Sequence, residues 1–159
     1  MSIVFIAPDP DIARQYRGIL ACAPDKVEVV EALLSEAIPV ARQLEERDAE
    51  VFVARGGTAM LLRQAGIKSP IVELHLTSAD VVQALTEAKS KAHFDHAAIA
   101  IVAFPGMIQN LLDFLPLLSL PLRCYTLTSE DDAPGRVDEA IAAGAQVLLG
   151  GAITVKIAR

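Results

Sequence analysis

Residues 49–63 read AEVFVARGGTAMLLR, and residues 145–159 match them without a gap as AQVLLGGAITVKIAR. Each stretch begins with a short apolar run, passes through a glycine pair and continues into a helical pattern. The same offset of 96 residues places Ile3–Ala7 on Ile99–Ala103, and Val27–Val30 on Arg123–Thr126. Several segments that match in one register predict an internal duplication.

Short apolar, β-branched runs alternate along the chain with longer helical patterns. This alternation is typical of βαβ units with a parallel sheet. The predicted strands are Ile3–Ala7, Val27–Val30, Val51–Ala54, Ile71–Leu74, Ala98–Ala103, Leu122–Thr126 and Val147–Leu149. The predicted helices are Asp11–Leu20, Ser35–Arg47, Ala59–Gln64, Ala79–Lys91, Met107–Leu118, Gly135–Ala142 and a helix from Ala152 onward.

The predicted fold class is α/β, with two similar Rossmann-like lobes, parallel sheets and a cleft between them. We expect a first lobe at residues 1–78, a connecting helix and linker at 79–94, and a second lobe at 95–159. The first lobe continues beyond the repeated stretch, whereas the second stops at Arg159, so we expect the second lobe to lack its last strand. An exposed sheet edge favours a homo-oligomer such as a dimer.

Composition excludes several function classes. The 159 residues carry 14 Lys and Arg against 20 Asp and Glu, a net charge of −6, so this chain by itself is not expected to bind nucleic acid. Cys22 and Cys124 have neither the spacing of a zinc site nor that of a disulfide framework. We expect a reduced, cytoplasmic protein that does not enter a membrane.

One strand-to-helix turn has the residues of an anion site. Arg55 offers a bidentate guanidinium, and Gly56 and Gly57 allow a ligand to approach the backbone closely. The Thr58 hydroxyl and the first N–H groups of the helix are predicted to point at the ligand. The alternative interpretation is a plain turn, with Thr58 as the helix N-cap and Arg55 in a surface salt bridge.

Ligands of parallel α/β proteins bind beyond the carboxyl ends of the strands. The loops that follow the other predicted strands are therefore further candidates for ligand contact. The second-lobe counterpart of the anion turn is Gly150, Gly151 and Thr154, and Ser78 begins a predicted helix after another strand. The remaining predicted ligand contacts are Phe104, Pro105 and Gly106.

Catalytic and metal residues are not predicted. The sequence holds no P-loop, no nucleophile elbow and no paired Cys and His, and we expect no cofactor. His93 and His96 lack zinc-motif spacing, so a metal site is not expected there either.

Several motifs together resemble the N-terminal sensor domain of the propionate-catabolism activator (PrpR) family of bacterial enhancer-binding transcription regulators. They are VARGGTA at 53–59, PIVEL at 70–74, SADVVQAL at 78–85, AIVAF at 100–104, YTLTSEDD at 125–132 and GGAIT at 150–154. The resemblance covers nearly the whole chain.

The resemblance implies a ligand-sensing domain, not a catalyst, that acts on a downstream ATPase domain and a DNA-binding domain outside this chain. The namesake of the family responds to 2-methylcitrate, so the resemblance implies a di- or tricarboxylate ligand in the cleft. Two other functions remain open from the sequence: a stand-alone isomerase or lyase acting on a small acid, and a dimerisation module without a ligand.

Overall fold

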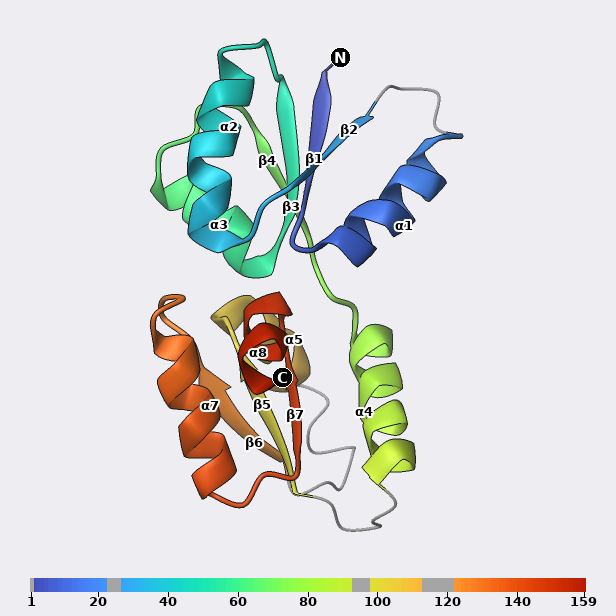
Figure 1. The fold of residues 1–159 in the computed structure, drawn as a ribbon, viewed down its shortest axis with the longest axis vertical. Coiled ribbons are helices and arrows are strands. Elements are labelled where there is room, and N and C mark those ends of the chain that lie inside the picture. The colour runs from blue at the N-terminus through green and yellow to red at the C-terminus, as the bar shows by residue number, and fades with distance from the viewer. Residues whose placement is uncertain (1, 23–26, 93–97, 113–121) are drawn as a thin grey trace. The chain divides into compact units, whose positions relative to one another are not determined.

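The computed structural model describes residues 2–22, 27–92, 98–112 and 122–159. The chain forms two compact units, residues 1–74 and 75–159. Each unit is an α/β domain with one parallel sheet (Figure 1). The predicted α/β class with two parallel sheets is confirmed.

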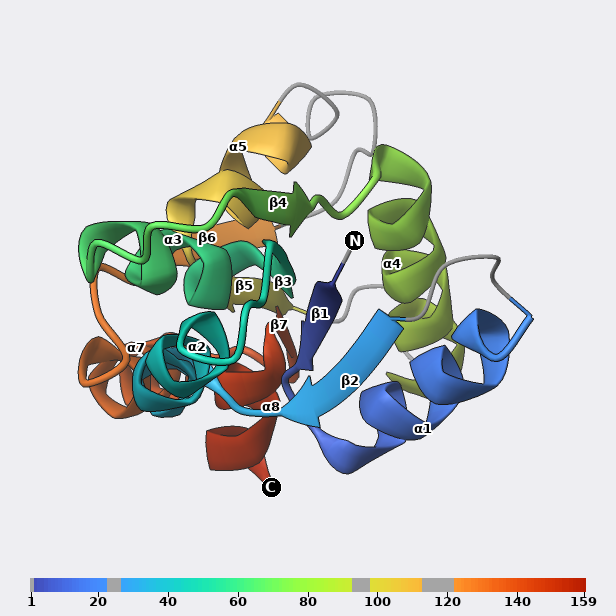
Figure 2. The ribbon, with the colours of Figure 1, turned by 90° about the horizontal axis from the view of Figure 1, so that it is seen from above.

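The first unit has a four-stranded sheet in the order β2-β1-β3-β4, which Figure 2 shows along the strands. Helix α1 covers one face, and α2 and α3 cover the other. Its elements are β1 (Ile3–Ala7), α1 (Pro10–Leu20), β2 (Val27–Glu31), the 3-10 helix η1 (Leu34–Glu36), α2 (Ala37–Glu45), β3 (Val51–Arg55), α3 (Gly56–Gln64) and β4 (Ile71–Leu74).

The second unit has a three-stranded sheet in the order β6-β5-β7 among the described residues. Helices α4 and α5 pack on one face, and α7 and α8 pack on the other. Its elements are α4 (Ser78–Ala92), β5 (Ile99–Ala103), α5 (Pro105–Leu112), β6 (Leu122–Thr126), α7 (Asp132–Ala142), β7 (Val147–Gly150) and α8 (Ala152–Ala158). Residues 113–118 of the predicted fifth helix lie outside the described residues.

The three strands of the second sheet have the same order as β2, β1 and β3 of the first sheet, which supports the predicted duplication. Ile3 pairs with Val51 in the first sheet, and their repeat equivalents Ile99 and Val147 pair in the second. The second strand of the repeat needs a correction of one residue. Val27 lies opposite Ile3, but Leu122, not Arg123, lies opposite Ile99.

The cores consist of apolar side chains on both faces of each sheet, because every crossover places a helix over a face. In the first unit Phe52 and Leu62 are fully buried on the face of α2 and α3. On the opposite face the Phe5 and Tyr16 rings stack with centroids 4.3 Å apart, which fixes α1 against β1. In the second unit Ile101 and Val102 face opposite ways into its two clusters.

Glycines follow two of the helices where the sequence indicated helix ends. Gly66 and Gly144 have φ of 72° and 88°, the left-handed conformation that only glycine adopts without strain. None of the helices among the described residues has the length and apolarity needed to span a bilayer.

Candidate anion site at the β3–α3 turn

The β3–α3 turn is sharp, with strand and helix in direct succession. Arg55 is the last residue of β3 and the N-cap of α3, with extended φ and ψ of −101° and 144°. Gly56 follows with φ of 37°, a left-handed conformation in which a Cβ would be strained although no atom lies within 4 Å of it. The Arg55 side chain makes no capping hydrogen bond, because a guanidinium has donors and no acceptor.

The Arg55 side chain is half-buried at the carboxyl end of the sheet. Among the residues that the structure describes, none forms a hydrogen bond or an ion pair with it. The surface salt bridge of the alternative interpretation is therefore not found in this part of the chain. A guanidinium with five donors lies beside the positive end of a helix of nine residues.

Thr58 lies inside α3, and the alternative interpretation that made it the N-cap is wrong, because Arg55 occupies that position. Its side chain is buried, with 5% of its surface exposed. The hydroxyl oxygen accepts a hydrogen bond of 3.2 Å from the backbone N–H of Leu34, the first residue of η1. Thr58 thus joins α3 to the segment after β2, and its buried hydroxyl is engaged in this internal hydrogen bond.

Leu34 is a residue that the sequence gave no reason to select. Its φ of 51° is unusual for a residue other than glycine. The hydrogen bond from its N–H to Thr58 and the burial of its side chain hold this conformation. No local signal could have found it, because the partner lies 24 residues away.

Gly150 and Thr154 make close packing contacts in the second unit. A Cβ at Gly150 would lie 2.5 Å from the carbonyl oxygen of Val102 and 2.5 Å from Cβ of Thr154. The Thr154 hydroxyl donates to the same Val102 carbonyl at 2.7 Å, and its side chain is 1% exposed. Gly150 is therefore required by the contact between α8 and β5. Gly151 is the half-buried N-cap of the seven-residue α8.

Phe104, Pro105 and Gly106 connect β5 to α5. The Phe104 carbonyl accepts from the backbone N–H groups of Met107 and Ile108, at 3.1 and 3.5 Å. Proline suits the first helical position because its missing N–H would have no partner there. Pro105 and Gly106 are exposed, whereas the Phe104 ring is half-buried against the cluster below α7 and α8.

Thr77, which precedes Ser78, caps α4. Its N–H and its hydroxyl donate to the Asp80 carboxylate at 2.8 and 2.7 Å, and its hydroxyl accepts from the Asp80 N–H at 3.3 Å. These three bonds form a capping box at the start of α4. Ser78 is the first residue of α4, and its side chain is not among those described.

Thr128, which precedes α7, makes similar contacts with an acidic side chain. Asp132 accepts from the N–H and hydroxyl of Thr128 and from the N–H of Ser129. These donors, the Thr128 hydroxyl first, hold the pKa of the Asp132 carboxyl below its ordinary value. Helix α7 begins at Asp132, three residues before the predicted start at Gly135.

The predicted contacts are divided between the two units. Arg55, Gly56, Gly57 and Thr58 belong to the first unit, and the other predicted contacts belong to the second. His93 and His96 lie outside the described residues. Within the described residues, no group of three or more His, Cys, Asp and Glu side chains is placed to hold a metal ion.

The structure is similar to the crystal structure of an NtrC family transcriptional regulator from Clostridium acetobutylicum, with a TM-score of 0.82 and 16% sequence identity. The match covers 99% of this chain and 81% of that one. At this identity the likeness establishes the fold, and the class of protein comes from the sequence match.

A family model described as propionate catabolism activator matches residues 23–159. The chain belongs to this family, as its N-terminal domain, and is a regulatory sensing domain of a transcription regulator. The match confirms the resemblance deduced from the motifs. A search of curated proteins found no match.

Proposed function

We propose that this domain binds a small di- or tricarboxylate through Arg55 and the N-terminus of α3, and relays the binding to a downstream ATPase and DNA-binding domain. The observation that carries the proposal is the half-buried Arg55 guanidinium, which has no partner among the described residues. A planar carboxylate fits the two parallel N–H donors of a guanidinium. The family to which the chain belongs supports the sensing role.

Within this site Gly56 and Gly57 would give the ligand access to backbone N–H groups, because neither residue carries a side chain of its own. Thr58 acts indirectly, since its bond to Leu34 fixes the start of α3. The contacts in the second unit, Ser78, Phe104 to Gly106, Gly150, Gly151 and Thr154, stay predictions from the sequence. Of these, Gly150 and Thr154 already pack against the Val102 carbonyl of their own unit.

The test compares Arg55→Gln with Arg14→Gln, which removes the same charge from an exposed helical position whose ion pair is with Asp11. Citrate and 2-methylcitrate are titrated against each protein by calorimetry and by thermal unfolding. A ligand at 100 times its Kd stabilises the folded state by about 2.7 kcal/mol, which is readily measured. Triethyl citrate, which carries no charge, is the ligand control.

We expect wild type and Arg14→Gln to bind one of these acids equally. Arg55→Gln should bind it at least about tenfold more weakly, because a charge-assisted hydrogen bond contributes about 1.5–3 kcal/mol. Full affinity in Arg55→Gln would exclude this turn as the anion site. Equal binding of triethyl citrate would show that charge is not what the site recognises.

A further inference from the structure

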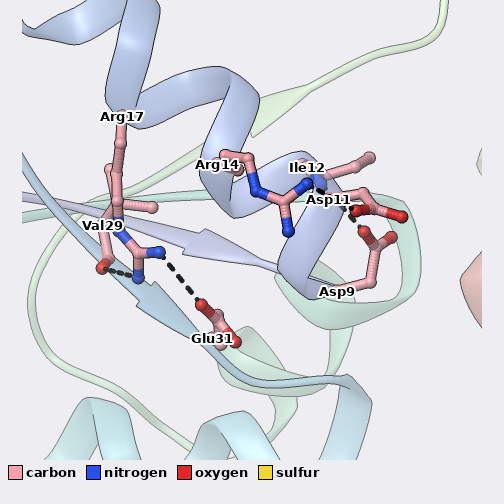
Figure 3. Close-up of polar contacts among 7 residues, drawn as sticks. All are labelled: Asp9, Asp11, Ile12, Arg14, Arg17, Val29 and Glu31. Carbon is pink, nitrogen blue, oxygen red and sulfur yellow. Dashed lines mark hydrogen bonds and ion pairs between the residues drawn. The ribbon is translucent and has the colours of Figure 1, made fainter.

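The outer strands of the first sheet, β2 and β4, are each contacted by an arginine in the same way. Arg17 of α1 donates to the carbonyl of Val29 at 3.2 Å and forms an ion pair of 3.1 Å with Glu31, both on β2 (Figure 3). Arg63 of α3 donates to the carbonyl of Ile71 at 3.3 Å and pairs with Glu73 at 2.7 Å, both on β4. In each case the acid stands two residues after the carbonyl.

Both carbonyls point away from the sheet. The N–H of Ala32 bonds to Ala7 of β1, so the alternate residues Val29 and Glu31 direct their backbone groups outward. The carbonyl of Pro70 accepts from Phe52 of β3, so Ile71 and Glu73 likewise face outward on β4. Arg17 and Arg63 therefore occupy the backbone groups that an added strand would need.

The two arginines come from helices on opposite faces of the sheet and reach opposite edges. The side chains are about half exposed, at 51% for Arg17 and 47% for Arg63. Their partners differ, since Glu31 is 41% exposed and Glu73 is 16% exposed. An ion pair as exposed as that of Arg17 with Glu31 contributes about 0–1 kcal/mol, so stabilisation of the fold does not account for that contact, although the same geometry recurs at Arg63. A charged side chain laid over an edge is instead a known means of preventing strand addition.

We propose that Arg17 and Arg63 close the two edges of the first sheet against pairing with a second copy of this chain. Each arginine places a cation and its aliphatic stem across an outward carbonyl, and the glutamate two residues on holds the guanidinium there. A strand from another copy could pair with β2 or β4 only after displacing these contacts.

The variants Arg17→Met and Arg63→Met keep the aliphatic stem and remove the donors. The matched control is Arg14→Met with Arg136→Met, which removes the same charge from pairs with Asp11 and Glu139 that touch no strand. Analytical ultracentrifugation over a range of concentrations measures the mass, and urea unfolding confirms that each variant is folded.

Each single variant exposes one edge of the sheet. We therefore expect it to form a species of twice the wild-type mass and no larger assembly. The double variant opens both edges and should form larger species. Adding Glu31→Pro and Glu73→Pro should reverse the association, because proline removes an outward N–H without breaking a bond to β1 or β3. A wild-type mass in the folded double variant, equal association of the control, or association that persists with the prolines would each overturn the proposal.

Discussion

Thr58 and Thr154 occupy equivalent positions of the two repeats, and their buried hydroxyls bond to the backbone in opposite senses. Thr58 accepts a hydrogen bond from the N–H of Leu34, whereas Thr154 donates one to the carbonyl of Val102. The first bond joins a helix to the loop after the sheet's outer strand, and the second joins a helix to the central strand. The equivalent threonines of the two repeats thus stabilise different contacts between elements.

Thr58→Val should destabilise the first unit by about 1–3 kcal/mol, because it leaves the N–H of Leu34 buried without an acceptor. The substitution keeps the shape of the side chain, so packing changes little. Urea unfolding measures the difference. Thr86→Val is the control, since the Thr86 hydroxyl is exposed and bonds only to Val82 within α4. An equal loss of unfolding free energy in both variants would show that the hydrogen bond to Leu34 contributes no more than an exposed one.

Gly150→Ala should lower the free energy of unfolding by about 1–3 kcal/mol, the usual cost of inserting a methyl group into a packed site. The new Cβ would lie 2.5 Å from the Val102 carbonyl, which belongs to the central strand and has little room to move. Gly151→Ala is the matched control, because no atom lies within 4 Å of a Cβ there. Thermal unfolding of both variants measures the difference. A Gly150→Ala protein as stable as Gly151→Ala would contradict the close packing of α8 on β5.

The duplicated stretch, with its alternation of strand and helix patterns, was enough to predict the α/β class with two parallel sheets, because parallel strands need a crossover, usually a helix, between them. It could not fix the register of the second strand. Val27–Glu31 and Leu122–Thr126 show the same alternation of half-buried and exposed residues, so Leu122 is the equivalent of Val27. The ungapped alignment missed this because the connection before β6 is one residue shorter than the one before β2.

The site was predicted less completely than the fold. The sequence selected Arg55 and Gly56 correctly as a strand-to-helix turn, since both signals are local. The partners of Thr58 and Thr154 are distant in sequence, at 24 and 52 residues, and no local pattern reports such contacts. In sequence, a threonine after a glycine pair fits a hydrogen bond to a ligand as well as a hydrogen bond within the protein. Only the tertiary packing distinguishes these two roles.

Glu45, at the end of α2, collects three hydrogen bonds on one carboxylate oxygen. The N–H groups of Lys68 and Ser69 donate to it at 2.8 and 2.6 Å, and the Ser69 hydroxyl donates at 2.9 Å. These donors, the Ser69 N–H first, hold the pKa of the Glu45 carboxyl below its ordinary value. Because the folded pKa is lowered, the charged carboxylate stabilises the fold above the unfolded pKa, and this contribution is lost as the pH falls through the folded pKa.

Glu45→Gln should therefore reduce the free energy of unfolding at neutral pH, and its difference from wild type should shrink as the pH falls below about 4.3, the ordinary value for glutamate. Urea unfolding between neutral and acidic pH measures this dependence. Glu46→Gln removes the neighbouring charge from an exposed side chain with no hydrogen bond to the described residues, and it should follow wild type at every pH. A Glu45→Gln difference that stays constant with pH would mean that the three bonds do not favour the charged carboxylate, because only a group whose pKa changes on folding makes stability depend on pH.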